Sequence, residues 1–519
     1  MIATASVDGT TSIKATTTSS DVRTRHIALH VYYDGGSYSG LAENIGQGND
    51  TSVERAIFLA LTKANFITLR DEHCQYSRCG RTDKGVSACG QIIALQLKSA
   101  FPIEATMYNP NDNHQDRSIA TNDDTITNDD LPRNSFESRT VWVPPRKSKR
   151  NSDGTSSYTQ KIIREYAYDK ILNNLLPSDI RILGWCPVST TFSARFSCTT
   201  RTYRYFFTAP KQVTDDLSDS KKKAGRLSID RMKEGLQNMI GTHDFRNFCK
   251  MDVEKVYNFV RTIHSADIVI ESTLSNVHIC FLHIVGQAFL WHQIRCIVHV
   301  LFLIGRGNED PSIVQDLLNI EQNPGKPSYP LADERPLVLH ECRYANLSIG
   351  YSATNLWNVL TVQEHQWEDH ILAAARIRNN LNNLLSMAVR VDELLEFARS
   401  KLQIRTKKQR GANQEAAIAE LVPPTTSTLG AISWGDALCW LESNGIIPEP
   451  SKLVENVYTP LLQRSKGTTY EEKVKAIQQK DPSSKRQQKY ENNVIKKRKT
   501  KEEDAAFYNH MTQQGGSSF

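Results

Sequence analysis

The 519-residue sequence has no pair of cysteines at the short spacing of a zinc finger or a redox motif, although it contains ten cysteines. The closest three, Cys74, Cys79 and Cys89, have no matching pair of histidines. The histidines form no HxxxH or HxE pattern in a predicted helix, and GRTDKG lacks the spacing of a phosphate-binding Walker loop. We therefore expect reduced thiols, no metal site and no bound nucleotide.

Long hydrophobic runs are also absent. The longest apolar stretch, residues 288–304, is interrupted by two histidines, a glutamine and an arginine, so it is too short and too polar to cross a bilayer. Residues 1–20 are rich in Thr and Ser and contain no apolar segment of the kind that a secretory signal needs. We expect a protein without membrane partners, and no export.

Charge of one sign is only weakly in excess. The formal net charge is +6, so any contact with nucleic acid must come from local clustering of basic residues. A hydrophobic content of 39% is enough for a sizeable core. Alternation over Ile27–Tyr33 predicts a strand, and Thr51 with Glu54 predicts a capping box for a helix whose buried face holds Val53, Ile57, Leu61 and Ala64. The order of elements is that of an α/β domain.

The most informative segment is Cys79–Val86, in which Asp83 stands between Arg81 and Lys84 in a loop bounded by glycines. A strand is predicted directly after it, so the carboxylate lies on a tight turn leading into a sheet. Two interpretations stay open on spacing alone. The segment is either a reactive site or an Asx-type turn with solvated charges.

Four segments, found in the expected order, resemble the tRNA pseudouridine synthases that modify the anticodon stem-loop. They are CGRTDKGVSACGQ from Cys79, FSARFSCTTRTYRYFF from Phe192, GTHDFRNFCKMD from Gly241 and GQAFLWHQIRCIV from Gly286. The third is similar to the eukaryotic branch that modifies tRNA positions 38 and 39. A weaker similarity lies at Tyr458–Val474.

The resemblance implies an α+β fold, with a mixed and largely antiparallel sheet of two similar halves, flanked by helices, around an RNA-binding cleft. It also implies tRNA as the partner and a homodimer. The predicted division of the chain is a disordered tail at 1–25, an N-terminal catalytic half at 26–210 with a disordered insertion at about 102–160, a C-terminal half at 226–345, a helical extension at 346–480 and a basic disordered tail at 481–519.

The implied reaction breaks the bond between C1′ and N1 of uridine and rejoins the base through C5, which needs no cofactor. Asp83 is the predicted catalytic carboxylate, acting as nucleophile or as base. Burial alone would favour its neutral form, so a partner cation is expected, and the resemblance assigns this role to Arg295. The alternative for Arg295 is a side chain that extends from an apolar helix to solvent.

The remaining candidates concern the RNA. Tyr203, in Arg201-Thr202-Tyr203, is the implied stacking partner of the target base, with Tyr205 as its substitute if the register is shifted. Arg81 is the implied wedge that fills the gap left by the extruded base, although a loop salt bridge is the alternative. The predicted RNA-binding residues are Arg81, Lys84, Arg201, Arg246 and His292.

Three other readings stay open: a synthase with other RNA targets, a non-catalytic RNA-binding or chaperone protein on the same scaffold, and an independent interaction module after Tyr344. The C-terminal tail carries Lys485-Arg486 and Lys496-Lys497-Arg498-Lys499, which is typical of nuclear import or RNA contact, with functionless disorder as the alternative. We expect the protein in nucleus and cytoplasm; no Arg precedes Arg23, which argues against a mitochondrial leader.

Overall fold

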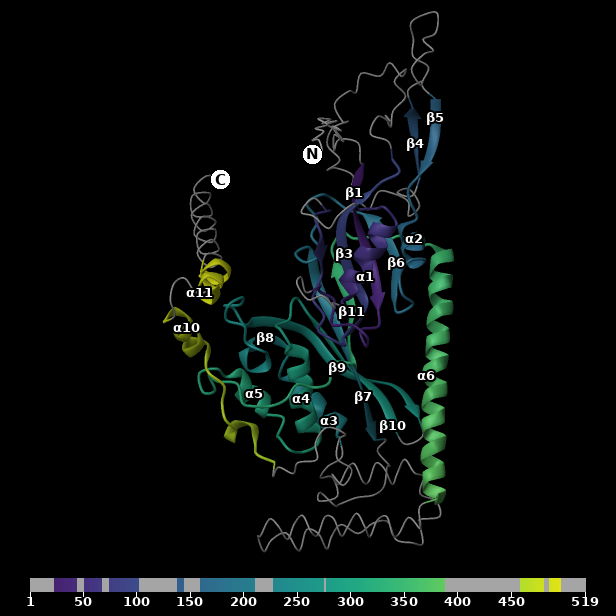
Figure 1. Ribbon diagram of the computed structural model, residues 1–519. Coiled ribbons are helices and arrows are strands. Elements are labelled where there is room, and N and C mark those ends of the chain that lie inside the picture. The colour runs from purple at the N-terminus through teal and green to yellow at the C-terminus, as the bar shows by residue number, and fades with distance from the viewer. Residues whose placement is uncertain are drawn as a thin grey trace, which may run out of the picture.

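One long mixed sheet organises the molecule (Figure 1). The computed structural model describes residues 23–43, 51–67, 74–101, 138–143, 159–210, 227–274, 277–387, 458–479 and 485–495. The strand order is β6-β1-β3-β11-β7-β10-β9-β8, with β2 paired to β3. The bounds are Thr24–Tyr33 (β1), Ser77–Arg78 (β2), Ser87–Lys98 (β3), Ile180–Pro187 (β6), Cys198–Pro210 (β7), Gly241–Asp244 (β8), Val260–Leu274 (β9), Val277–Gly286 (β10) and Leu337–Tyr344 (β11).

The two halves of the sheet are joined by a short parallel contact. Strands β3 and β11 pair in parallel through Val338 with Ser87 and Leu339 with Ala88, whereas the other described strand pairs run antiparallel. The predicted class, a mixed and largely antiparallel sheet flanked by helices, is confirmed. The loop that carries Asp83 ends where β3 begins, so the parallel contact between β3 and β11 lies beside this loop.

Helices α1 (Val53–Lys63) and α2 (Tyr168–Asn173) cover the N-terminal part of the sheet. The predicted inward face of α1 is confirmed, because Val53, Ile57 and Leu61 are buried. The predicted cap is wrong by one residue. The Ser52 hydroxyl accepts the Arg55 amide at 3.3 Å, and the Glu54 carboxylate instead binds the side chains of Arg78 and Tyr76.

A second core lies under helices α3 (Ile229–Gln237), α4 (Gln293–Gly305) and α5 (Ile313–Leu318). Ser228 caps α3, since its hydroxyl accepts the Arg231 amide at 3.4 Å. The apolar stripe of α4 is buried, as its periodicity predicts. Tyr203 on β7 packs against both cores and so marks the place where they meet.

The predicted insertion at 102–160 contains regular structure that its composition does not indicate. Strand β4 (Ser138–Val143) pairs antiparallel with β5 (Thr159–Arg164). The reason is local, because Thr140-Val141-Trp142-Val143 favours extended backbone within an Asn- and Asp-rich stretch. The rest of the insertion, and residues 1–22 of the predicted tail at 1–25, lie outside the described residues. The end of that predicted tail is wrong, because β1 already begins at Thr24.

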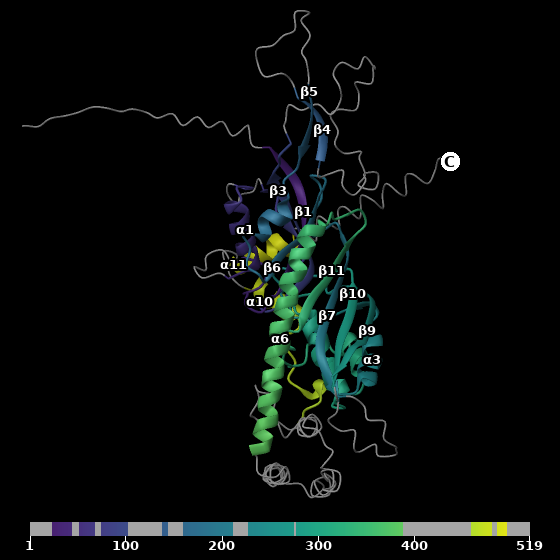
Figure 2. The same cartoon turned by 90° about the vertical axis from the view of Figure 1, so that its right-hand side faces the viewer.

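The helical extension begins with α6 (Ala353–Met387), a helix of 35 residues that runs along the side of the molecule beside β6 (Figure 2). Its buried Asn355 donates hydrogen bonds to the backbone oxygens of Ile182 and Leu183. In the part of the chain that the structure describes, no helix is long and apolar enough to cross a membrane.

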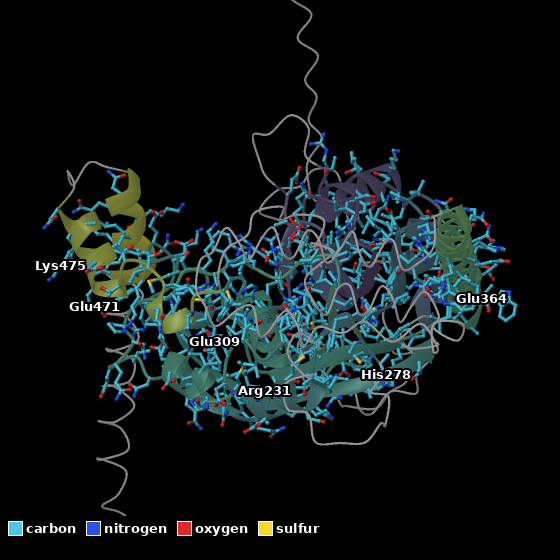
Figure 3. The ribbon with its side chains drawn as sticks, turned by 90° about the horizontal axis from the view of Figure 1, so that it is seen from below. Arg231, His278, Glu309, Glu364, Glu471 and Lys475 are labelled. Carbon is cyan, nitrogen blue, oxygen red and sulfur yellow. The ribbon has the colours of Figure 1, made fainter. Side chains whose placement is uncertain are left out.

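The C-terminal segment returns to the C-terminal core. It contains the short helix η4 (Leu461–Gln463) and helix α10 (Tyr470–Gln478), followed by α11 (Lys485–Tyr490) and η5 (Glu491–Ile495). Leu461 is fully buried in that core. Figure 3 shows Glu471 and Lys475 of α10 at one end of the molecule and Glu364 of α6 at the other. The reading of everything after Tyr344 as an independent module is therefore wrong for this segment.

Candidate active site

Neighbouring segments hold the loop of Asp83 rigidly. The Thr82 hydroxyl hydrogen-bonds to the Tyr33 hydroxyl at 2.7 Å, and the Thr82 oxygen accepts the Leu41 amide at 3.2 Å. Gly85 has φ +79°, a conformation that other residues rarely adopt. The neighbouring turn approaches so closely that a Cβ atom on Gly35 would lie 2.0 Å from the Val86 oxygen. The position of the carboxylate is thus set by backbone contacts.

Two residues that precede α4 contact the Asp83 carboxylate. The Trp291 Nε1–H donates to Oδ1 at 3.2 Å, and His292 Nε2 lies 3.3 Å from Oδ2. The side chain of Asp83 remains 31% exposed, so a substrate can reach it. His292 has φ +62°, an unusual conformation for a residue with a side chain, and strained backbone of this kind clusters at functional sites.

The imidazole of His292 is held in its neutral form. Burial lowers its pKa, and the nearby Asp83 carboxylate only partly offsets this effect. Because a carboxylate accepts but does not donate, Nε2 carries the hydrogen and Nδ1 is an acceptor. Among the described residues Nδ1 has no hydrogen-bond partner. Asp83 is thus contacted by one neutral donor, the Trp291 indole, and by the ring of His292.

The predicted ion pair between Asp83 and Arg295 does not form in this structure. Arg295 Nη2 lies 2.6 Å from Glu334 Oε2, and its Nε donates to the Ala332 oxygen at 2.7 Å. The reason is the start of α4: Trp291 and His292, just before the helix, reach the loop, while Arg295 faces the segment before β11. Glu334 itself packs against Gly85, since a Cβ there would lie 2.8 Å from its Cγ. Glu334 is a site neighbour that no sequence motif indicates.

Tyr203 on β7 lies next to the loop that carries Asp83. Its ring meets Phe289 edge to face at 5.3 Å between centroids, and its hydroxyl would lie 3.9 Å from a Cβ on Gly80. Burial raises the pKa of this hydroxyl, so it stays protonated. Tyr205 is buried in the C-terminal core, which confirms that it is the core residue of the pair.

Two predicted RNA-binding residues have structural roles. The Arg201 guanidinium donates to the backbone oxygens of Gln287 at 2.6 Å, Arg195 at 2.9 Å and Cys79 at 3.1 Å, and so ties three of the motifs together. Arg246 binds the Asp244 carboxylate, with Nη2 to Oδ2 at 2.8 Å, and lies 3.5 Å from Glu471. Both guanidinium groups bind protein oxygens in this structure, and contact of either with RNA stays a prediction.

Basic side chains surround the loop on two sides. Arg81 and Lys84 are exposed, as predicted, and burial together with the nearby Arg78 lowers the pKa of Arg81. Two residues that the sequence did not single out extend this surface. Phe196 is 83% exposed, and the Arg195 guanidinium stacks over its ring at 5.4 Å. On the other side Lys250 lies 4.4 Å from the centre of the Trp291 ring.

Comparisons with known proteins agree with the motifs. Residues 236–345 match the family described as tRNA pseudouridine synthase. The chain is 37% identical to the tRNA pseudouridine(38/39) synthase of Mus musculus over 388 residues, which cover 72% of this chain and 68% of the relative. This chain belongs to the tRNA pseudouridine synthase family.

More distant relatives share the same family name. The tRNA pseudouridine(38/39) synthase of Saccharomyces cerevisiae is 33% identical over 66% of this chain and 61% of its own. The tRNA pseudouridine synthase A of Methanothrix thermoacetophila is 27% identical over 62% and 84%, respectively. In this synthase the loop supplies Asp83, β7 supplies Tyr203, and the turn before α4 supplies Trp291 and His292.

Proposed function

We propose that this synthase converts uridine to pseudouridine in the anticodon stem-loop of tRNA, at positions 38 and 39, with no cofactor. Membership of the family supports the reaction, and the printed names of the relatives from Mus musculus, Bos taurus and Homo sapiens support the two positions. The observation that carries the proposal is the accessible Asp83 carboxylate, rigidly held by Trp291 and His292 in a basic surrounding.

The reaction balances without an added group. The C1′–N1 bond breaks, the base turns, a C1′–C5 bond forms, and the hydrogen at C5 moves to the ring nitrogen. A carboxylate serves this sequence either as a nucleophile or as a base near the sugar. Either role uses the carboxylate in its ionised form.

The proposal is tested by site-resolved pseudouridine mapping. Transfer RNA treated with the purified protein, and tRNA from cells that lack it, are compared at each uridine. Pseudouridine at positions 38 and 39 only, and its loss there in the cells, supports the proposal. Modification elsewhere supports the reading with other RNA targets, and binding without modification supports the non-catalytic reading.

Tyr203→Phe is expected to retain activity, whereas Tyr203→Leu is expected to lose it by about 5- to 150-fold. The reason is that a phenyl ring keeps the stacking face, which is worth about 1–3 kcal/mol, and a leucine does not. Single-turnover rates measure the difference. Phe206→Leu is the matched control, because Phe206 packs on Phe281 on the opposite face of β7. An inactive Tyr203→Phe would show that the hydroxyl takes part.

Arg81→Ala is expected to slow single turnover by about 10-fold and to reduce the salt dependence of tRNA binding by about one counterion. The exposed guanidinium can stack in the gap left by the flipped base or contact phosphate. Arg343→Ala is the control, since Arg343 is exposed but pairs with Glu341 on β11. Unchanged rate and affinity in Arg81→Ala would rule out the wedge role.

We also propose a homodimer that is present in nucleus and cytoplasm. Large apolar side chains on α6 are exposed in the described part of the chain, among them Trp357, Trp367 and Ile377, and such a surface favours self-association. A monomeric mass in light scattering would reject the dimer.

Loss of nuclear signal when residues 496–499 are neutralised would support the import role of the tail; unchanged distribution would reject it.

A further inference from the structure

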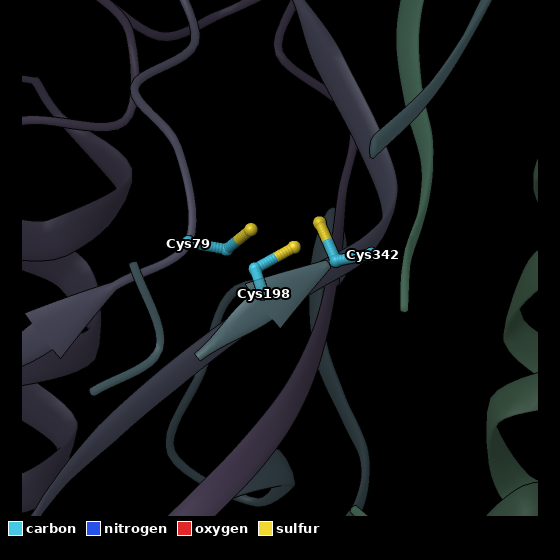
Figure 4. Close-up of side chains that lie close together, drawn as sticks. All are labelled: Cys79, Cys198 and Cys342. Atoms are coloured by element: carbon cyan, nitrogen blue, oxygen red, sulfur yellow. The ribbon is translucent and has the colours of Figure 1, made fainter. Parts of the chain in front are cut away.

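Three cysteines that are far apart in the sequence meet beside the Asp83 loop. Cys79 precedes the loop, Cys198 is the first residue of β7, and Cys342 lies on β11. Their Sγ atoms all lie within 4.8 Å of one another. Figure 4 shows the three side chains grouped closely, each from a different segment of the chain.

This grouping differs from ordinary burial of thiols. Nine cysteines lie in the described residues, and Cys79, Cys198 and Cys342 are the only group of three metal-ligating side chains among them that comes this close. Cys79 and Cys198 are buried, so bulk water does not compete for the sulfurs. Packing alone would be met by any small apolar residue, as it is by Ala194 in the same cluster. Three converging sulfurs add an affinity for thiophilic metal ions.

The geometry suits zinc. A tetrahedral ion with Zn–S bonds of about 2.3 Å holds its sulfurs about 3.8 Å apart, so movements of about 1 Å or less suffice here. The Tyr344 hydroxyl, two residues beyond Cys342, donates to the Ala194 oxygen at 2.7 Å. A water molecule is a suitable fourth ligand.

The charge also suits zinc. Three thiolates and one Zn²⁺ carry a net charge of −1, and the Arg201 guanidinium, which donates to the Cys79 oxygen at 3.1 Å, supplies the balancing positive charge. Binding would release three thiol protons to solvent. No sequence spacing signals such a site, because each ligand comes from a separate segment.

We propose that Cys79, Cys198 and Cys342 bind a zinc ion, which ties the segment before the Asp83 loop to strands β7 and β11. The role is structural: the ion cross-links two halves of the sheet next to the catalytic carboxylate. The site does not depend on the proposed reaction, so metal binding and pseudouridine formation fail or succeed separately.

The test uses the full chain, purified without chelator. Elemental analysis is expected to find about one zinc per chain, and Co²⁺ added to stripped protein is expected to give thiolate-to-cobalt charge-transfer absorption. The variants Cys79→Ser, Cys198→Ser and Cys342→Ser are each expected to lose most of both signals. Cys280→Ser, which changes a fully buried cysteine on β10, is expected to keep them.

The cobalt titration of the unmodified protein does not depend on whether the variants fold. A protein that is folded by circular dichroism but binds neither zinc nor cobalt would overturn the proposal. Metal retained by a variant in which all three cysteines are changed to serine would also overturn the proposal. A thiol count two lower than the ten of the sequence, without bound metal, would identify a disulfide instead and equally overturn it.

Discussion

Asp83→Ala is expected to lower pseudouridine formation by about 10⁴-fold or more while leaving the fold and the affinity for tRNA nearly unchanged. The carboxylate is the reacting group under either chemical role. The neighbouring acid Glu334 cannot replace it, because its carboxylate is bound to Arg295 at 2.6 Å. The measurement is single-turnover formation of pseudouridine, mapped by position, together with tRNA binding.

The small effect on stability follows from the surroundings of Asp83. Its side chain is partly exposed, and it accepts one long hydrogen bond, from Trp291, so about 1 kcal/mol of folding free energy is at stake. Asp83→Asn keeps the shape of the side chain but removes the carboxylate, and it is expected to be as inactive as Asp83→Ala. Asp267→Asn is the control, because Asp267 lies on the far strand β9, in an exposed ion pair with Lys233 of α3. Turnover by Asp83→Ala above the level of an enzyme-free reaction would contradict the assignment.

Much of the fold could be predicted from sequence because local signals agree with it. The apolar face of α1 and the Ser228 cap of α3 are where periodicity and cap chemistry put them. The error at Thr51 arose because two neighbouring hydroxyl residues both satisfy the cap rule, and only tertiary contacts of Glu54 with Arg78 decide between them. The return of Leu461 to the core could not be read locally, since it depends on contacts with distant residues.

The position of a site residue could be predicted where it lies in a motif. The hydrogen-bond partners of that residue could not, because they depend on how distant parts of the chain pack together. Asp83 lies in an accessible turn, as its glycine-bounded loop indicates. The partner of Arg295 was not predictable, because Glu334 lies on no motif and comes close only through the path of the chain before β11. The same holds for Arg201: nothing in its spacing shows that three backbone oxygens occupy its guanidinium.

A chain ended at residue 350 is expected not to fold stably. Truncation removes Leu461, which is fully buried, and a buried leucine alone is worth about 2–5 kcal/mol out of a total of about 5–15 kcal/mol. It also removes the amide of Leu461 and the hydroxyl of Tyr458, both of which donate to the Glu309 carboxylate. Finally, it removes Asn355, which binds the backbone of β6.

Soluble yield and thermal unfolding of the truncated chain measure this effect. A chain ended at residue 495 keeps every described residue and is the control, expected to unfold like the full protein. Leu461→Ala in the full chain isolates the largest single contact and is expected to lower the free energy of unfolding by about 2–5 kcal/mol. If residues 1–350 were soluble, unfolded cooperatively and modified tRNA at the full rate, the segment from Tyr458 would be a separable module after all, and its burial against the C-terminal core would add nothing that the synthase needs.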